Sequence, residues 1–378
     1  MPLSVGPLVL DPELGIRSGY FLYDDDFAGV VDLPRGKVLE FKGIVTFGIQ
    51  DHHGHPTLAA LLAEAVDLSI CKDFKCVEKL LESQRQELKV GVNYGLPGRP
   101  RMKLRDSWIV FSRSLHRVYA SPDLEPRGYL GWFGTILDWM GMERFYKNLN
   151  RVLEEYASLG YISVTDMYTL PDLLPRRSPI ELKRYCPIPG CDGVKVFVDG
   201  TLEGGDILLG PIAHGECPFR DGVNVAAHAM GDGAVDILLK SCSSRFRIEH
   251  AIVLREDQIK EISERGITVC IQPSFLELDE EIAPRVLGER ISLAFRFGSL
   301  EKHGVKVLIG SDFPIGNPHP IRMLRLATGL RAPEWFRDPM SLEGYLRGLV
   351  GTEPKTNYIS IVESTGVRSL RIDELLPS

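Results

Sequence analysis

The sequence lacks several features that would each place it in a broad class. It has no basic excess, because 51 Asp and Glu outnumber 44 Lys and Arg and give a formal net charge of -7. A general nucleic-acid binder would need a basic surface to neutralise phosphates. No apolar run approaches the roughly 18 residues of a membrane span, and the N-terminus lacks the basic start and apolar stretch of a signal peptide. We therefore expect a soluble, cytoplasmic protein without nucleic-acid or membrane partners.

Cysteine is also scarce and unpatterned. The chain has seven cysteines, and none of them forms a Cys-x-x-Cys motif. Cys71/Cys76 and Cys186/Cys191 are separated by longer loops than a zinc knuckle favours. We expect free thiols partly packed in the core, with a structural disulfide as the alternative.

The order of apolar segments indicates the fold. The 378 residues would accommodate an α/β barrel of roughly 250 residues and a smaller unit. Residues 1–43 contain short extended pieces between turns, which predicts a small antiparallel β layer. From residue 44, strand-like runs alternate with helical patterns, as in a parallel sheet covered by helices. We expect residues 44–350 to form a (β/α)8 TIM barrel. Residues 1–43 and 351–378 would form a small, reduced β-sandwich-like layer from both termini.

Short runs rich in Val and Ile supply the strands of this predicted barrel. They lie at 44–50, 108–111, 161–165, 194–198, 224–227, 246–249, 267–271 and 306–309. Between two of them, Leu254, Ile259 and Ile262 follow a helical spacing that ends at Gly266. A weaker run at 65–70 would lie outside the barrel or in an elaborated first loop.

Histidine placement is the main indication of chemistry. His53 and His55 follow the first strand in IVTFGIQDHHGHP, and alternation along an extended chain lets both rings reach one ion. His228, His250 and Asp312 each end a later strand. In such barrels the active site forms at the carboxyl ends of the strands. Imidazole nitrogens and a carboxylate are zinc-type ligands, so these five residues predict a divalent-metal site with an open position for water.

These motifs resemble the amidohydrolase superfamily, within it the YtcJ-like, formamide-deformylase-like branch. The matching segments are DHHGHP, LGYISVTDM, GVKVFVDGTL, AAHAMGDGAVD, RIEHA and GSDFPIGNPHP. They occur in the family's order over residues 44–345. The resemblance implies a metal-dependent hydrolase of amide, formamide or cyclic C–N bonds other than peptide bonds, acting on a small molecule.

Lys195, in GVKVFVDG, decides how many ions the site would hold. In many relatives the lysine of the fourth strand is carboxylated and bridges two metals. A lysine buried in a parallel strand is costly unless neutralised or paired, and a carbamate between two cations would remove this cost. The alternative is a protonated Lys195 paired with Asp166 or Asp199 beside one metal. Zn is the expected metal, although Mn, Fe or Co would suit the same ligands.

The resemblance also implies a mechanism. Metal-activated hydroxide would attack the substrate, and Asp312 would carry its proton to the leaving nitrogen. With two ions, His53 and His55 would hold the first, His228 and His250 the second, and Lys195 both. With one ion, His53, His55, His228 and Asp312 would be ligands, and His250 would orient the water.

Other residues are expected around this centre. His116 resembles the family's substrate-facing histidine and would stabilise the oxyanion. Arg113 would bind an anionic group, and His319 would line the mouth of the site. Asp51 and Asp166 would accept the free N–H of ligand histidines.

The chain also departs from the family. The loop after Lys195 reads DGTLEGGD, and the connection from the first barrel strand to the second is short. We expect residues 71–106 and 200–222 to form the substrate walls. A deaminase with the same site and a metal-binding protein without turnover remain alternatives, and a homodimer is possible among such barrels.

Overall fold

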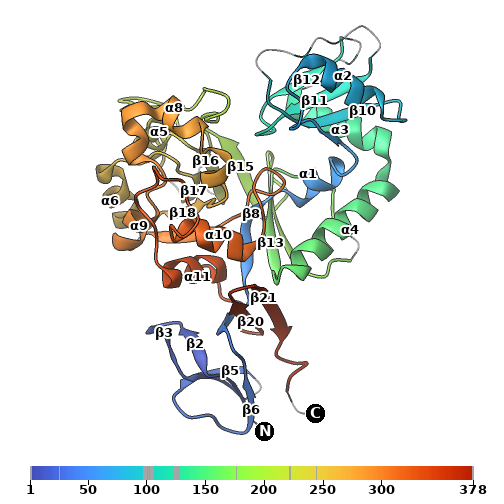
Figure 1. Ribbon diagram of the computed structural model, residues 1–378. Helices are drawn as coiled ribbons and strands as arrows, with labels where there is room; N and C mark the ends of the chain where they lie inside the picture. Colours follow the sequence, from blue (N-terminus) through green and yellow to red (C-terminus); the bar gives the residue numbers. More distant parts are fainter. Residues whose placement is uncertain are drawn as a thin grey trace.

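The computed structural model describes residues 2–376 except 25, 97–99, 101, 103–105, 123, 125–127, 176, 221–222 and 244. Its centre is a parallel sheet hydrogen-bonded in the order β19-β18-β17-β16-β15-β14-β13-β8. Helices pack around this sheet, an inserted unit lies at one end, and sheets from both termini lie at the other (Figure 1). The predicted (β/α)8 barrel with an additional terminal β layer is confirmed.

The barrel strands are short, and most of them are largely buried. They are β8 Gln50–Gly54, β13 Ser163–Met167, β14 Glu181–Cys186, β15 Gly193–Phe197, β16 Val225–Ala229, β17 Phe246–His250, β18 Thr268–Ile271 and β19 Lys306–Ile309. Neighbouring strands pair in parallel from β8 to β19. The ring closes where the backbone N–H of Asp312, just after β19, donates to the carbonyl of His53 at 2.7 Å.

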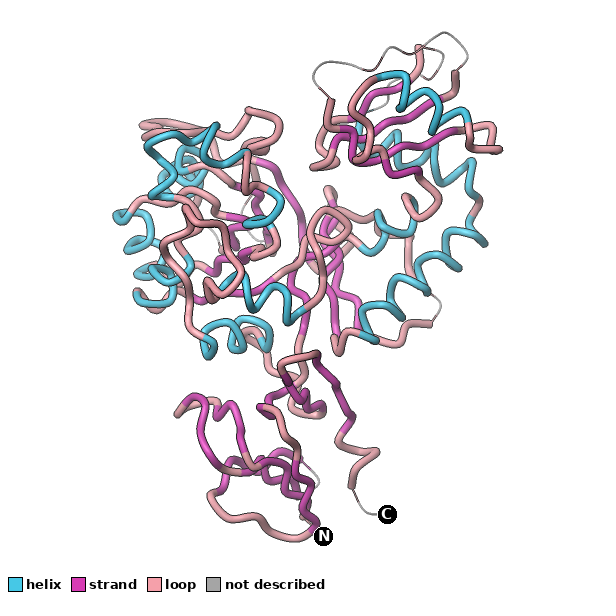
Figure 2. The backbone as a smooth tube through the Cα atoms, in the orientation of Figure 1, coloured by secondary structure: helices cyan, strands magenta, loops and turns pink. Residues whose placement is uncertain are grey.

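The helices cover the outside of this sheet (Figure 2). The helix expected before Gly266 is α6 Glu256–Glu264, which buries Ile259 and Ile262 and is followed by Gly266 at φ 63°. The other helices after β16 are α5 Asp232–Ser241, α7 Phe275–Leu278, α8 Ile282–Leu287, the 3-10 helix η1 Gly288–Leu293, α9 Phe297–Lys302, α10 Pro320–Ala327 and α11 Leu342–Val350.

The first predicted strand, 44–50, was wrong as a single element. β7 Ile44–Phe47 belongs to a terminal sheet, where it pairs with β2 and β20, and the barrel strand β8 begins at Gln50. Gly48 lies at the crossing, where an added Cβ would stand 2.4 Å from Ile162 Cδ1. The apolar run at 44–50 therefore contains β7, a strand of a terminal sheet, and the start of a barrel strand, β8.

The predicted second barrel strand, 108–111, was also wrong. It is β11 Trp108–Ser112, which lies in a separate sheet of order β12-β11-β10-β9. Trp108 and Val110 pack into a small core of this unit, whereas Ile109 and Phe111 belong to the main core. Because both faces are buried, β11 has the same apolar composition as a barrel strand.

This sheet belongs to an insertion between β8 and β13, so the expected short connection was wrong. Residues 55–162 contain α1 Pro56–Leu61, β9 Val66–Asp67, α2 Phe74–Glu82, β10 Lys89–Tyr94, β11, β12 Val118–Ala120, α3 Gly128–Met140 and α4 Met142–Ser158. The weak run at 65–70 lies in this elaborated first loop, as expected.

The barrel strand that the sequence did not reveal is β14, with the sequence ELKRYC. Only Tyr185 and Cys186 in it are buried. A half-exposed strand that carries Lys183 and Arg184 has no apolar run, so hydrophobic periodicity does not detect it.

Two sheets form the terminal layer. The first has the order β5-β4-β1-β6, from β1 Leu3–Gly6, β4 Tyr20–Asp24, β5 Asp26–Val31 and β6 Lys37–Glu40. The second has the order β21-β20-β7-β2-β3, from β2 Leu8–Asp11, β3 Gly15–Ser18, β7, β20 Tyr358–Glu363 and β21 Gly366–Arg371. The C-terminal strands thus return to the N-terminal layer.

Six cysteines are paired, so the expectation of free thiols was wrong for them. The disulfides are Cys71–Cys76, Cys186–Cys191 and Cys217–Cys242, whereas Cys270 is free and buried. The first two link residues only five positions apart, a local loop closure that spacing alone did not distinguish from two free thiols.

Among the described helices, none combines the length and the apolar character needed to traverse a lipid bilayer.

The separate core of the insertion makes a stability prediction. Leu81 is fully buried there beside Val77 and Trp108, and Leu81→Ala should cost about 2–5 kcal/mol. Hydrogen exchange should accelerate in β10 and β11 and stay unchanged in β16 and β17. Equal acceleration in the barrel strands would show that the two cores unfold together.

Candidate metal centre

The ends of the barrel strands bring the predicted histidines and Asp312 together. His53 lies in β8, His228 in β16 and His250 at the end of β17. His250 and Asp312 have left-handed backbones, with φ of 76° and 57°. This conformation is unfavourable for residues other than glycine and is concentrated at functional sites.

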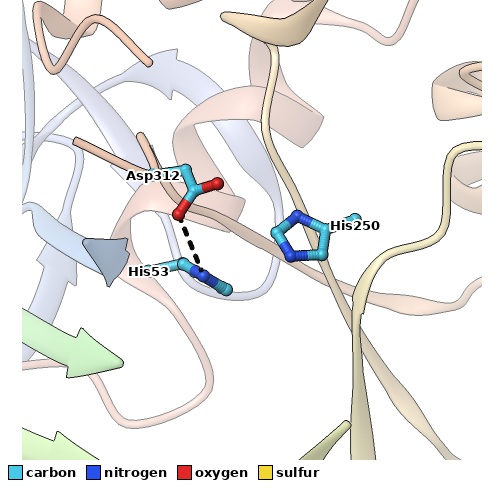
Figure 3. A group of neighbouring side chains, drawn as sticks. All are labelled: His53, His250 and Asp312. Carbon is cyan, nitrogen blue, oxygen red and sulfur yellow. Dashed lines mark ion pairs between the residues drawn. The ribbon is translucent and has the colours of Figure 1, made fainter. Parts of the chain in front are cut away.

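Asp312 faces both histidines of the His-x-His motif. Its Oδ1 lies 3.2 Å from His53 Nε2 and 2.8 Å from His55 Nε2. Figure 3 shows His250 to the right of Asp312 and His53, with its ring turned toward both of them. His53, His250 and Asp312 each offer a ligand atom, and these atoms lie within 4.8 Å of one another. One ion could therefore contact all three.

His228 joins this cluster through its contact with His250. The ring centroids of His53 and His250 are 4.9 Å apart, and those of His250 and His228 are 4.4 Å apart. His250 Nδ1 contacts Gln272 Oε1 at 2.8 Å, and His228 Nε2 contacts the Gly200 carbonyl at 2.9 Å. The predicted set is thus one continuous group of side chains.

Burial makes these imidazoles neutral. Loss of hydration lowers the pKa of His55, and it holds the pKa values of His228 and His250 well below the usual range. Burial alone would raise the pKa of Asp312, but His53 and His55 hold it well below its usual range. Neutral imidazoles beside a carboxylate have the protonation states that metal ligands require.

Two buried atoms test whether a cation fits this cluster. His53 Nε2 and Asp312 Oδ1 make no hydrogen bond within the described part of the chain. His53 Nδ1 lies 2.5 Å from a Glu249 oxygen, so this nitrogen carries the ring proton and Nε2 presents a lone pair. A lone pair that faces a carboxylate oxygen is costly in a buried site. A divalent cation would satisfy both atoms, so the residues fit a metal.

Lys195 lies close to this cluster on β15 and is 3% exposed. Its amine makes no hydrogen bond to any described residue, and it lies 5.5 Å from the centre of the Phe197 ring. Burial lowers its pKa to about 8. The pairing considered for the one-metal alternative is absent among the described contacts, because Asp199 instead accepts the backbone N–H groups of Met230 and Gly231 at 2.9 and 2.8 Å.

The expected contacts of Asp51 and Asp166 were wrong. Asp51 accepts the backbone N–H groups of His53 and Ser311 at 3.1 and 3.0 Å, and Asp166 accepts the backbone N–H and hydroxyl of Thr57. Neither carboxylate contacts an imidazole nitrogen among the described hydrogen bonds, because the donors nearest to them are backbone N–H groups and hydroxyls. Burial raises the pKa of Asp51 to about 6 and that of Asp166 to about 7.

Glu249 makes the contact with a histidine ring that was expected of Asp51 or Asp166. It precedes His250 in RIEHA, is fully buried, and contacts His53 Nδ1. The RIEHA motif drew attention to this segment, but a carboxylate next to a ligand gave no indication of its partner 196 residues away.

A narrow pocket beside the cluster contains two of the predicted substrate-facing residues. Arg113 and His116 line it together with Asp312, and the His116 ring lies 4.9 Å from that of His228. His319 is instead the N-cap of α10 and is not among the residues lining this pocket. The other residues that line it are Ser114, Thr201, Leu202, Glu203, Met230, Phe275, Leu278, Asp279 and Ile315.

The insertion brings His116 to this position. The backbone N–H of Ser114 donates to Glu203 at 2.7 Å, and Arg117 donates to the Gly204 carbonyl. Of the expected wall 200–222, only residues 201–203 line this pocket, and residues 221–222 lie outside the described residues. None of the described residues of 71–106 lines it, and the loop around Arg113 does so instead.

Comparisons with known proteins agree with this geometry. Residues 190–343 match the model of the amidohydrolase family. Protein LONG AFTER FAR-RED 3 of Arabidopsis thaliana is 28% identical over 174 residues, which are 38% of this chain and 30% of that protein. The match thus spans less than a third of the plant protein.

Solved structures share the fold. An uncharacterized metal-dependent hydrolase from Pyrococcus furiosus has a TM-score of 0.66 at 21% identity, covering 92% of this chain and 93% of its own. A second, from Pyrococcus horikoshii OT3, has a TM-score of 0.65 at 18% identity and covers 89% and 88%. The assignment to the YtcJ-like branch stays a prediction.

Burial of Asp166 predicts a pH dependence of stability. Its pKa is about 7 in the fold against an ordinary value of 3.8, so the folded state binds the proton more tightly. The contribution of this bound proton to the free energy of unfolding is complete below about pH 4 and is lost as the pH rises through 7. Each pKa unit corresponds to about 1.4 kcal/mol.

The Asp166→Asn variant should remove this pH-dependent contribution to stability. Its Tm relative to wild type should rise between pH 4 and pH 8, as measured by thermal unfolding. A constant Tm difference over this range would contradict the assignment.

Proposed function

The chain belongs to the amidohydrolase superfamily, and on this premise we propose that it is a metal-dependent hydrolase that cleaves a non-peptide C–N bond in a small molecule. The substrate class would be an amide, a formamide or a cyclic amide. One observation carries the proposal: His53 Nε2 and Asp312 Oδ1 lie 3.2 Å apart in the buried cluster, and neither atom has a hydrogen-bond partner among the described residues. Such an arrangement is unfavourable without a cation and well suited to hold one.

The described residues define which groups would hold the metal. His53, His55, His228, His250 and Asp312 are the candidate ligands, with Zn²⁺ as the proposed ion. When bound, the cation would act as a Lewis acid and lower the pKa of water to roughly 7. The ligand set would hold one or two ions, depending on the chemical state of Lys195.

The unpaired amine of Lys195 supports the two-ion version. A neutral lysine amine adds to CO₂ to form a carbamate, with release of one proton, and the product carries two oxygens that can bridge cations. Neither Asp166 nor Asp199 pairs with the amine among the described contacts. A carbamate would replace a buried, unpartnered nitrogen by a group that cations can neutralise.

Asp312 is the proposed proton carrier. It lies beside both histidines of the motif and lines the substrate pocket. There it would accept a proton from the attacking water and return it to the leaving nitrogen. His116, which lines the same pocket, would donate to the developing oxyanion, and Arg113 would contact an anionic part of the substrate.

Solved structures with the same fold support a hydrolytic role without defining the substrate. A Xaa-Pro dipeptidase has a TM-score of 0.51 at 11% identity, and an ochratoxinase from A. niger has a TM-score of 0.54 at 12% identity. Deamination would use the same residues but would leave a carbonyl in place of the amino group, so formation of a carboxylate product distinguishes amide cleavage from it.

The Asp312→Asn variant tests the proposed role of this carboxylate. Wild-type protein loaded with Zn²⁺ should hydrolyse members of an amide, formamide and lactam library. The variant should lose about 10²–10⁴-fold in kcat while it retains Zn²⁺, as measured by elemental analysis. His303→Ala, at the C-cap of an outer helix, is the control. Metal retention without any Asp312-dependent turnover would favour a binding protein over an enzyme.

The state of Lys195 makes a separate prediction. Native mass spectrometry of wild type prepared with bicarbonate and Zn²⁺ should show an added CO₂ and two ions per chain. Lys195→Met should lose the added mass and bind fewer ions. An unmodified lysine with a single ion would contradict the two-ion version.

A further inference from the structure

We propose that Arg247 and Glu249 form a positioning pair that fixes the ligand histidine His53 through both its ring and its backbone. The proposal rests on the proposed function, because it assigns the pair a role toward the metal that His53 would bind. The two residues lie two positions apart in β17, so they project from the same face of that strand.

Glu249 holds the ring. Its Oε2 lies 2.5 Å from His53 Nδ1, and both residues are fully buried. An ionised carboxylate only accepts hydrogen bonds, so the ring proton must lie on Nδ1. Nε2, which faces Asp312 Oδ1 at 3.2 Å, then keeps the lone pair that a metal ligand needs. The contact therefore selects both the tautomer and the direction of the ring.

Arg247 holds Glu249 and the backbone next to His53. Its guanidinium donates to both oxygens of Glu249, and its Nη2 also donates to the carbonyl of His52 at 2.6 Å. That carbonyl belongs to the peptide unit directly before His53. One cation therefore restrains the ligand from two sides, through the carboxylate that orients its ring and through the chain that carries it.

The chemistry of arginine suits this task. A buried carboxylate is costly without a counter-charge, and a planar guanidinium can serve several acceptors at fixed angles. Arg247 also stacks on Tyr185 of β14 at 5.3 Å. It is thereby held between β8, β14 and β17, and a lysine could not reproduce these contacts.

Zinc affinity separates a positioning role from a merely structural ion pair. Zn²⁺ dissociation constants are measured by chelator competition for wild type, Glu249→Gln and Arg247→Lys, and thermal unfolding of the metal-free proteins reports stability. In Glu249→Gln, an amide oxygen that accepts the hydrogen bond from His53 Nδ1 leaves the amide NH2 group facing the Arg247 guanidinium. Two donors then face each other, which is unfavourable. We expect Zn²⁺ affinity to fall by about 10–100-fold, with a smaller loss for Arg247→Lys. The ligand-field spectrum of bound Co²⁺ should change in both variants.

Arg255→Lys is the matched control. Arg255 pairs with Asp232 and Asp236, whose side chains are 0% and 2% exposed, and none of the three contacts His53 in the described structure. This variant should lower the Tm of the metal-free protein without changing Zn²⁺ affinity or the Co²⁺ spectrum.

The outcomes distinguish this proposal from the proposed function. If wild type binds no Zn²⁺ or Co²⁺, the proposed function fails and this pair has no metal to position. If wild type binds Zn²⁺ and both variants bind it equally well, the pair is structural and the proposal is overturned. If Glu249→Gln does not fold, unchanged Zn²⁺ affinity in Arg247→Lys overturns it, and weakened affinity at unchanged Tm supports it.

Discussion

The seam between β8 and the segment after β19 is the constraint on which the site depends. Asp312 N–H donates to His53 O, and His55 N–H donates to Phe313 O, both at 2.7 Å. Gly310 lies against this seam, where an added Cβ would stand 2.4 Å from His53 Cβ. The hydrogen bonds that close the barrel are therefore the same ones that bring Asp312 to the two histidines. Closure of the barrel and assembly of the site therefore depend on the same two hydrogen bonds.

Much of this arrangement could be predicted from the sequence. The carboxyl ends of parallel strands meet at one edge, so side chains that end apolar runs, such as His228 and Asp312, must converge. The position of Lys195 in the fourth strand was also correct, although for a partly wrong reason. The error of counting β11 as a barrel strand was compensated by the omission of β14.

The remaining features depend on contacts that local patterns do not encode. β11 has two apolar faces because it separates two cores, which is indistinguishable in sequence from burial inside a barrel. β14 is polar because one side of it is open. Glu249, unlike Asp51 and Asp166, contacts the His53 ring, and this contact depends on how the barrel brings β17 near the histidine of β8. Side-chain partners across the barrel follow from tertiary structure alone.

The insertion has a consequence for how this chain can change. Its outer core, around Trp108 and Leu81, is separate from the main core, while its loop reaches the pocket with Arg113 and His116. The groups that would bind the metal come from barrel strands and the connections that follow them, whereas these two substrate-facing groups come from the inserted unit. Substitutions in the outer core can therefore shift the loop by small amounts without disturbing the strand pairing of the barrel. In the proposed function, the metal ligands thus belong to the barrel, whereas two groups that would meet the substrate, including the oxyanion-stabilising His116, are carried by a unit with a core of its own.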